Sequence, residues 1–306
     1  MNERNILVVA HAGRDETVAA ARRVVDLLRS AGARPVLAPD DRSELSAVDE
    51  DFSEVDALGD AVSVDEIELA IVLGGDGTIL RAAELVRGSA APVLGINMGH
   101  VGFLAEIERD AMDDAVHRVI ARDYGVEERL TLSVRVKDSA GDVVFETWAL
   151  NEATVEKASR ERMIEVVVEI DGRPLSSFGC DGMVVSTPTG STAYNFSAGG
   201  PVIWPSVEAI AVIPLSAHAL FARPLVVSPG ASVAIEMLER TSGTGILWCD
   251  GRRSHDLPPG ARVVVRRSSR PVRLARLHPT EFTDRLVRKF QLPVAGWRGQ
   301  DGGLPA

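Results

Sequence analysis

Residues 69–80, LAIVLGGDGTIL, combine a strand pattern, a glycine loop and a helix pattern in one short stretch. An apolar run ends at GGDG, and apolar residues then recur at helical spacing from Thr78 onward. Glycines let a backbone approach a phosphate closely, and the free N–H groups at a helix N-terminus attract its charge. The carboxylate of Asp76 repels phosphate, so it suits a base for a substrate hydroxyl, or an acceptor for a sugar hydroxyl or a metal ion. The stretch indicates phosphoryl chemistry, with Gly75 and Gly77 beside the phosphates.

Two common phosphate-loop patterns do not fit this stretch. A Walker A loop ends in Gly-Lys-Ser/Thr, whereas no lysine is present here, and a dinucleotide-binding GxGxxG would need glycine at Leu80. The alternative interpretation is a hairpin, because Asp-Gly is a strong turn signal. Taken alone, the loop leaves both interpretations open.

A second glycine-rich turn, GINMGHVGFL, occupies residues 95–104 and again follows an apolar run. In an open parallel sheet, two such loops at the carboxyl ends of strands line one crevice. A plain glycine-rich connection is an equal alternative for this segment by itself.

Two polar stretches lie farther along the chain. Asn151-Glu152 follows an apolar run, and an amide beside a carboxylate suits purine edges and ribose hydroxyls; a surface turn is the simpler alternative. Residues 180–201 begin with Cys-Asp-Gly and continue through STPTGSTAYNFSAGGP, which offers many hydroxyl groups and one ring that could stack on a base. A disordered Ser/Thr linker is the alternative, and the apolar strand before the stretch and Phe196 within it argue against that.

Strand and helix patterns alternate in the first part of the chain. Strands are expected at 6–10, 35–38, 69–73 and 92–96, and helices after Asp15 and over 111–120. This order predicts a doubly wound α/β domain with a parallel sheet over residues 1–125. From residue 126 to 277 short alternating runs predict an all-β domain. An amphipathic helix is expected at 282–290, within a C-terminal tail (278–306) that returns to the first domain.

Composition narrows the class of protein. The chain has 306 residues, 45% hydrophobic and 25% charged, as in an ordinary soluble globular protein. Residues 40–68 hold twelve acids and one base, which accounts for the whole net charge of −11, and we expect a solvated, partly disordered and dispensable insertion.

Cys180 and Cys249 form no disulfide framework, so we expect free, non-catalytic thiols and a cytoplasmic protein. No apolar run reaches membrane-spanning length.

The motifs together resemble NAD kinase, which phosphorylates the adenosine-ribose 2′-hydroxyl of NAD to give NADP. They are GGDGT with Asp76, the turn ending in Phe103-Leu104, Asn151-Glu152, and Asp181-Gly182 followed by STPTGSTAY. GGDGT alone is shared with diacylglycerol kinases, sphingosine kinases and phosphofructokinases. The Asn-Glu pair and the hydroxyl-rich stretch make the resemblance specific, and FTDRL at 282–286 with GWRG at 296–299 resembles actinobacterial members.

The resemblance implies the two-domain architecture described above and a role for each motif. Asp76 would be the catalytic base, Asn151 and Glu152 would hold the adenosine, and Asp181 would lie beside the adenine or the amide end. The implied nucleotide-binding residues are Gly75, Gly77, Arg81, Phe103, Asn151, Glu152, Arg162, Asp181, Thr189, Thr192, Ala193, Tyr194, Asn195, Phe196 and Ser197.

The resemblance also implies the substrates and the assembly. NAD would be phosphorylated by ATP or inorganic polyphosphate, with Mg²⁺ bridging the donor phosphates, no metal ligands from the protein, and a homodimer or homotetramer as the active form. A lipid kinase would need an apolar pocket or a basic membrane-facing patch, and the sequence shows neither. An NAD-sensing module without activity would be expected to lack site residues that this chain retains. Neither nucleic acid nor membrane is expected as a partner.

Overall fold

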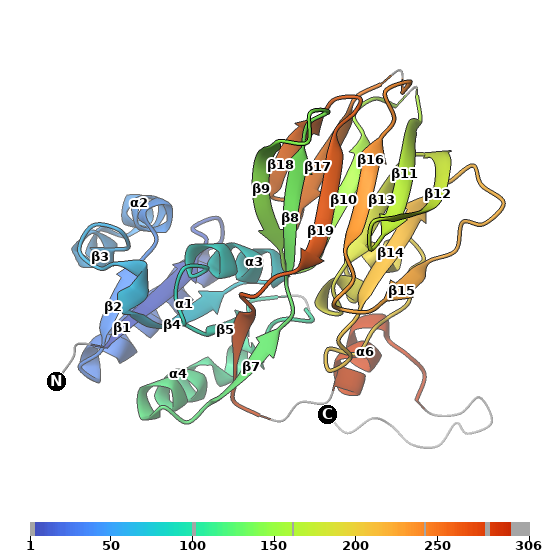
Figure 1. Ribbon diagram of the computed structural model, residues 1–306. Helices are drawn as coiled ribbons and strands as arrows, with labels where there is room; N and C mark the ends of the chain where they lie inside the picture. Colours follow the sequence, from blue (N-terminus) through green and yellow to red (C-terminus); the bar gives the residue numbers. More distant parts are fainter. Residues whose placement is uncertain (1–3, 100–101, 161, 242, 279–281, 295–306) are drawn as a thin grey trace. The chain divides into compact units, whose positions relative to one another are not determined.

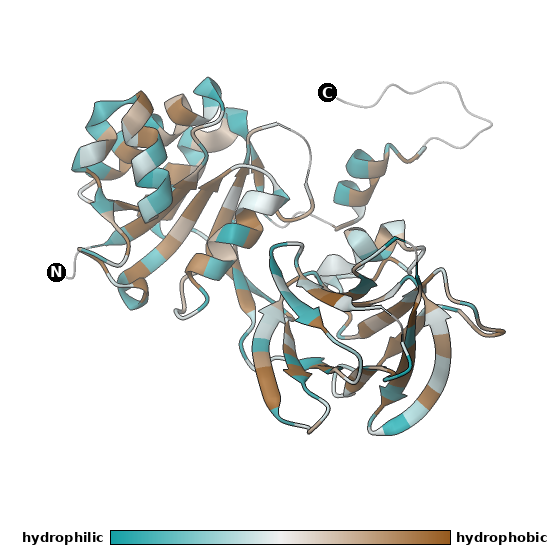
Figure 2. Cartoon of the chain, turned by 90° about the horizontal axis from the view of Figure 1, so that it is seen from above, coloured by the Kyte–Doolittle hydropathy of each residue, from teal (hydrophilic) through white to brown (hydrophobic). Residues whose placement is uncertain are grey.

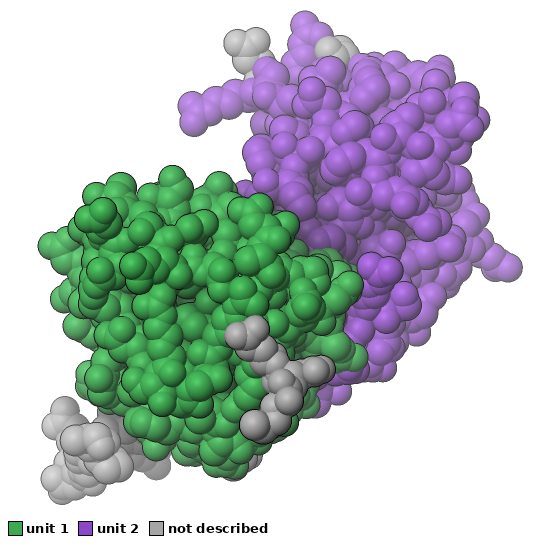
Figure 3. Space-filling model, turned by 90° about the vertical axis from the view of Figure 1, so that its left-hand side faces the viewer, with its two compact units in different colours: residues 1–127, 273–306 green, residues 128–272 purple. Residues whose placement is uncertain are grey.

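The computed structural model describes residues 4–99, 102–160, 162–241, 243–278 and 282–294. The chain forms two compact units (Figures 1 and 3). Unit 1 comprises Met1–Glu127 and Arg273–Ala306, and unit 2 comprises Glu128–Val272.

Unit 1 is built on an eight-stranded sheet with the order β3-β2-β1-β4-β5-β20-β7, in which β6 also pairs with β5. The pairs β1–β2, β1–β4, β2–β3, β4–β5, β5–β6 and β5–β20 are parallel. The strands are β1 (Asn5–Ala10), β2 (Arg34–Leu37), β3 (Asp56–Ala57), β4 (Ile67–Leu73), β5 (Val93–Asn97), β6 (Ile107–Glu108), β7 (Gly125–Arg129) and β20 (Val272–Arg276). The parallel α/β sheet expected from the alternating patterns is confirmed.

Helices cover both faces of this sheet, as a doubly wound fold requires (Figure 1). Alternate residues of β1, including Ile6 and Val8, share one core with α1 (Asp15–Ser30) and α4 (Met112–Ala121). On the opposite face, α3 (Asp76–Leu85) packs so closely on β5 that a Cβ at Gly95 would lie 2.4 Å from Cδ1 of Ile79.

The acidic segment is folded, so the expectation of a partly disordered insertion is wrong. Residues 39–68 form α2 (Pro39–Val48), two short 3₁₀ helices, β3 and the start of β4. Leu45 and Phe52 are buried in the core of unit 1, and the carboxylate of Asp41 is buried with them. Most of the remaining acids are at the surface, which explains why the composition resembles that of a solvated loop.

Unit 2 consists of two six-stranded sheets with the orders β15-β14-β13-β10-β17-β18 and β12-β11-β16-β19-β8-β9. Their strands are β8 (Leu132–Lys137), β9 (Val143–Ala149), β10 (Glu152–Lys157), β11 (Ile164–Ile170), β12 (Arg173–Cys180), β13 (Gly182–Ser186), β14 (Ile210–Leu215), β15 (Leu225–Val227), β16 (Val233–Met237), β17 (Gly245–Cys249), β18 (Arg253–Leu257) and β19 (Arg262–Arg267). Inward residues of both sheets, such as Val134 and Val185, form one hydrophobic core, and hydrophobic positions recur along the strands (Figure 2). The all-β domain expected from the sequence is confirmed as a β-rich unit. The described part of unit 2 also contains a short α-helix, α5 (Tyr194–Ser197).

The last described helix is α6 (Phe282–Phe290), at the bounds expected from the sequence. Its contacts with residues 103–106 place it on unit 1. The GWRG segment at 296–299 lies outside the described residues.

Candidate functional site

The GGDG loop connects the end of β4 to the first residue of α3. The helix begins at Asp76, two residues earlier than the sequence pattern indicates, with Gly75 as its N-cap. The N–H group of Gly74 donates to the carbonyl of Ile96 on β5. A Cβ on Gly74 would lie 2.4 Å from Oγ1 of Thr78, so the strand can turn this sharply into the helix only because residue 74 is glycine.

The next two glycines face open space. A Cβ added at Gly75 or Gly77 would meet no atom within 4 Å. Beside them lies a pocket of about 350 Å³ at the carboxyl ends of β1, β4 and β5, which is where a doubly wound sheet binds ligands. It is lined by His11, Gly13, Arg14, Thr17, Leu73, Gly74, Gly75, Thr78, Asn97, Met98 and Gly99. Backbone N–H groups of a helix start and an arginine make this pocket suitable for an anion.

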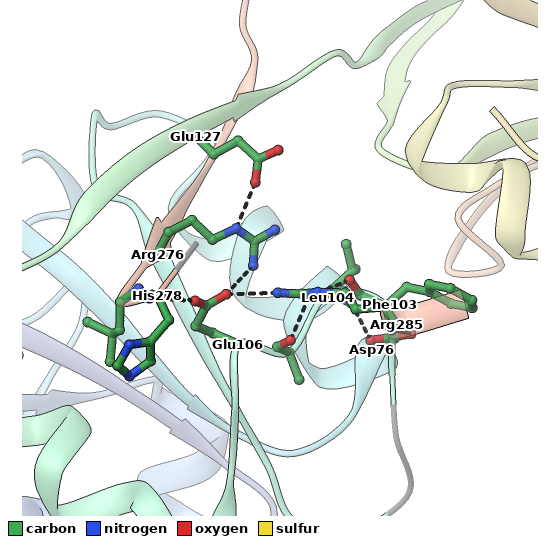
Figure 4. Close-up of polar contacts among 10 residues, drawn as sticks. Asp76, Phe103, Leu104, Glu106, Glu127, Arg276, His278 and Arg285 are labelled. Atoms are coloured by element: carbon green, nitrogen blue, oxygen red, sulfur yellow. Dashed lines mark hydrogen bonds and ion pairs between the residues drawn. The ribbon is translucent and has the colours of Figure 1, made fainter. Parts of the chain in front are cut away.

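The carboxylate of Asp76 is held by the second glycine-rich turn (Figure 4). Its Oδ2 accepts the N–H of Phe103 at 3.0 Å, and its Oδ1 accepts the N–H of Leu104 at 3.0 Å. A Cβ at Gly102 would lie 2.3 Å from Oδ1, so glycine is needed for this approach. Each carboxylate oxygen has a further lone pair, and Asp76 is only half-buried, so it can bind the turn and still accept a proton.

Two other predicted site residues of unit 1, Phe103 and Arg81, contact side chains of the same unit. The ring of Phe103 is buried and packs against Phe282 and Phe290 of α6, at centroid distances of 6.1 and 5.7 Å. Arg81 donates from Nη2 to both carboxylate oxygens of Asp41 at 2.5 Å. Its Nε is buried and has no hydrogen-bond partner among the described residues.

In unit 2, Asn151 and Glu152 are buried at the start of β10 rather than exposed in a surface turn. The carboxylate of Asp250 accepts the N–H groups of Leu150 at 2.9 Å and Asn151 at 2.7 Å. On the other side, a Cβ at Gly190 would lie 2.1 Å from the carbonyl oxygen of Asn151. The Asn-Glu pair is therefore held between the turn at Asp250 and the hydroxyl-rich stretch.

Glu152 has an unusual electrostatic environment. Burial, followed by the negative charge of Asp250, raises the pKa of Glu152 to about 8, although a backbone hydrogen bond from Tyr194 acts in the opposite direction. Burial also raises the pKa of Asp250, and hydrogen bonds from backbone N–H groups and the charge of Arg253 counter this. Oε2 of Glu152 has no hydrogen-bond partner among the described residues. Burial and the neighbouring carboxylate therefore favour the protonated form of Glu152, in which the carboxyl group can donate a hydrogen bond.

The hydroxyl-rich stretch forms a 3₁₀ turn (Thr189–Thr192) and the single turn α5. The side chains of Tyr194 and Phe196 are 37% and 43% exposed, so their rings are accessible to a ligand. Asn195, by contrast, is fully buried, and its Nδ2 donates to the carbonyls of Ser191 and Pro201. The remaining predicted residues of the stretch are Thr189, which is buried, Thr192 and Ala193, which are half-buried, and Ser197, which is exposed.

Two further predicted residues of unit 2 are more exposed. Asp181 forms an ion pair with Lys157 at 2.5 Å, and this hydrogen bond lowers the pKa of the carboxyl group. Arg162 is exposed in the connection between β10 and β11.

Three supporting residues are absent from the sequence-based site. They are Asp41, Asp250 and Arg285. Their buried charged groups bind, in that order, the guanidinium of Arg81, the N–H of Asn151 and the carbonyl of Phe103, all of which belong to predicted site residues. Cys249-Asp250-Gly251 carried a visible turn signal, and Asp250 indeed has a positive φ of 54°. Asp41 and Arg285 carried no comparable signal, because an acidic segment and a basic helix face both suggest solvent exposure.

Three further features bear on whether the protein is a lipid kinase or holds a metal ion. The described part of unit 2 has an apolar pocket of about 270 Å³, which is one of the features that a lipid kinase would need. The pocket is lined by side chains that include Leu175, Phe178 and Phe221. Within the described ranges, no three His, Cys, Asp or Glu residues are grouped so that they could hold a metal ion. Nor is any helix there long and apolar enough to cross a membrane.

Comparisons with known proteins relate both units of the chain to one family. Residues 6–124 match the model of the ATP-NAD kinase N-terminal domain, and residues 150–277 match that of the ATP-NAD kinase C-terminal domain. The chain is 66% identical over 300 residues to an NAD kinase of Leifsonia xyli, covering 98% of both chains.

Solved structures share the fold. A crystal structure of yeast NADH kinase in complex with NADH aligns with a TM-score of 0.86 at 22% identity, over 96% of this chain and 89% of the yeast chain. An NAD kinase from Archaeoglobus fulgidus in complex with ATP aligns with a TM-score of 0.68 at 24% identity, over 94% and 98% of the two chains.

Proposed function

The chain belongs to the NAD kinase family, and from that premise we propose that Asp76 is the base that deprotonates the adenosine-ribose 2′-hydroxyl of NAD during its phosphorylation to NADP. The observation that carries this role is the fixed orientation of the Asp76 carboxylate by two N–H groups, with lone pairs left over. A hydroxyl is a poor nucleophile at neutral pH, and a positioned carboxylate contributes on the order of 10²–10⁴ in rate.

The phosphates of the donor would occupy the pocket beside Gly75 and Gly77. The absence of side chains there leaves room for them, and the start of α3 offers backbone N–H groups. No lysine stands in the loop, so Arg14, which lines the pocket, would offset part of the phosphate charge. The donor would be ATP or inorganic polyphosphate, and a divalent metal ion such as Mg²⁺ would neutralise part of its phosphate charge. The ATP in the Archaeoglobus fulgidus structure supports the first of these.

NAD itself would be held by residues of unit 2. Asn151 and a neutral Glu152 offer an amide and an acid proton to the adenosine portion, and the exposed ring of Tyr194 offers a stacking face. Thr192 and Asp181 add polar groups. Arg162, exposed on a connection, would contact NAD at the edge of the site. Asn195 would shape the loop, because its amide donates to carbonyls of that loop.

The protein would act in the cytoplasm as a homodimer or homotetramer. Two buried thiols that are not bonded to one another fit a reducing compartment. Light scattering at assay concentration tests the assembly, and an active monomer would contradict it.

Asp76→Asn is the variant that tests the proposed base. Asparagine keeps the size of the side chain but has one carbonyl oxygen, so it can accept only one of the two N–H groups well. We expect turnover in a coupled NADPH-forming assay to fall by on the order of 10²-fold, with a smaller change in NAD affinity measured by calorimetric titration. The 2′-deoxy analogue of NAD should bind without being phosphorylated. Turnover near the wild-type rate would show that Asp76 only holds the turn, the ribose or the metal.

A further inference from the structure

A buried arginine of the C-terminal helix, Arg285, contacts the segment that holds Asp76 (Figure 4). Nη1 of Arg285 donates to the carbonyl of Phe103 at 2.9 Å and to that of Ala105 at 2.8 Å. Its Nη2 donates to the carboxylate of Glu106 at 2.9 Å. Arg285 is buried, and burial lowers its pKa. A buried guanidinium that binds two peptide carbonyls fixes the position of the backbone between them.

Glu106 anchors the other end of this arrangement. Its carboxylate is fully buried and also accepts Nη1 of Arg276 at 2.7 Å, together with the N–H groups of Leu277 at 3.1 Å and His278 at 3.2 Å. Nε of Arg276 donates in turn to Glu127 at 2.7 Å. Two guanidinium groups and two carboxylates thus balance in charge, which is the condition for a buried charge to be tolerated.

Ring packing adds a second, independent contact between α6 and the same segment. The ring of Phe103 lies against Phe282 in the first turn of α6 and against Phe290 in the last. Arg285 and Leu286, between them, are buried, whereas Arg288 on the same helix is exposed. The helix therefore contacts both the side chain and the carbonyl group of Phe103.

The N–H groups of this segment are the ones that bind Asp76. Phe103 accepts from Arg285 at its carbonyl and donates to Asp76 at its N–H group, and Leu104, the next residue, donates to the other oxygen. We propose that Arg285 is a positioning residue for Asp76, holding residues 103–106 so that their N–H groups orient the carboxylate. This inference rests on the proposed role of Asp76 as the base.

The test compares Arg285→Met with Arg288→Met, which makes the same chemical change at an exposed position of the same helix. We expect Arg285→Met to lower kcat by about 10- to 100-fold, because a displacement of the order of 1 Å at a catalytic group costs as much as 10² in rate. KM for NAD should stay within about threefold, since no residue assigned to NAD in unit 2 is touched. Arg288→Met should leave kcat within about twofold of wild type. An Arg285→Met enzyme with kcat equal to that of Arg288→Met would overturn the proposal.

A double-mutant cycle separates positioning from a general loss of structure. If Arg285 acts through Asp76, Arg285→Met should reduce kcat by less than about twofold in an Asp76→Asn background. An equal factor in both backgrounds would mean that Arg285 supports the fold alone and would refute the inference. Near-wild-type turnover of Asp76→Asn by itself would instead contradict the proposed base.

A second variant keeps the test decisive if Arg285→Met does not fold. Arg285→Lys retains a charge near Glu106 but cannot bridge both carbonyls in a fixed plane. We expect it to melt within a few degrees of wild type and still to lose about tenfold in kcat, with the same cycle as readout. A lysine enzyme with unchanged kcat would overturn the proposal.

Discussion

Asp41, which is buried, and Arg81, which is half-buried, form an ion pair that joins α2 of the acidic segment to α3, the helix that follows the GGDG loop. Both carboxylate oxygens of Asp41 lie 2.5 Å from Nη2 of Arg81, and Oδ2 also accepts the N–H of Ala10 at 3.2 Å. Burial raises the pKa of Asp41, and the hydrogen bond and charge of Arg81 oppose that rise. One carboxylate therefore connects the end of β1, α2 and the helix that begins at Asp76.

Asp41→Asn should destabilise the protein and weaken catalysis, because it leaves the guanidinium of Arg81 without its counter-charge. Removing one partner of a buried pair costs about 3 kcal/mol, which urea unfolding would measure as a lower midpoint. We expect turnover to fall several-fold in the same preparation. Asp40→Asn is the control, since it makes the same charge change at an exposed neighbour. Equal midpoints for the two variants would contradict this prediction.

The same pair revises the expectation that residues 40–68 are dispensable. Trimming exposed acids should be tolerated, whereas a deletion that removes α2 takes away the buried carboxylate and Leu45 together. The acidic composition did not reveal this, because one buried carboxylate among twelve acids leaves no periodic signal.

Local patterns predicted the local features of this protein. The strand, loop and helix at 69–80 could be predicted because an apolar run, three glycines and a 3.6-residue period occur consecutively. The helix 282–290 could be predicted from its amphipathic spacing. The contact of this helix with the segment that holds Asp76 could not be predicted, because Arg285 and the carbonyl of Phe103 are 182 positions apart in sequence. The contact between Asp250 and the N–H of Asn151 spans 99 positions and is equally invisible to a local pattern.

Gly102→Ala should disturb the candidate base directly. Its new Cβ would lie 2.3 Å from Oδ1 and 2.9 Å from Cγ of Asp76, so the carboxylate or the turn must move. We expect kcat to fall by at least about tenfold, measured in the coupled assay. Gly88→Ala is a matched control, because its Cβ would meet only Val64 at an ordinary 3.6 Å. Comparable kcat values for the two alanine variants would show that the orientation of Asp76 does not matter.

The two thiols should be unreactive and unnecessary for catalysis. Cys180 and Cys249 are free and buried, and burial raises the pKa of each thiol to about 12. The native protein should therefore react with a thiol reagent such as DTNB only as fast as it unfolds. Replacing both with serine should keep turnover within a few-fold, while each buried hydroxyl lowers stability by about 1–3 kcal/mol. Rapid labelling of the folded protein, or loss of turnover with the fold intact, would contradict this.

The stability of the protein should fall as pH rises toward 8, and Glu152 should be one cause. Its pKa is about 8 in the folded protein against an ordinary value of 4.5 for a glutamate, so between these values the folded state holds a proton that the unfolded chain has released. The free energy of unfolding then decreases with rising pH across this window. Glu152→Gln is neutral at every pH and should flatten this part of the profile, as measured by urea midpoints at intervals from pH 5 to 8.5. Glu239→Gln, an exposed control in unit 2, should retain the wild-type slope. Parallel profiles for wild type and Glu152→Gln would mean that Glu152 is ionised in the free protein and accepts, rather than donates, hydrogen bonds.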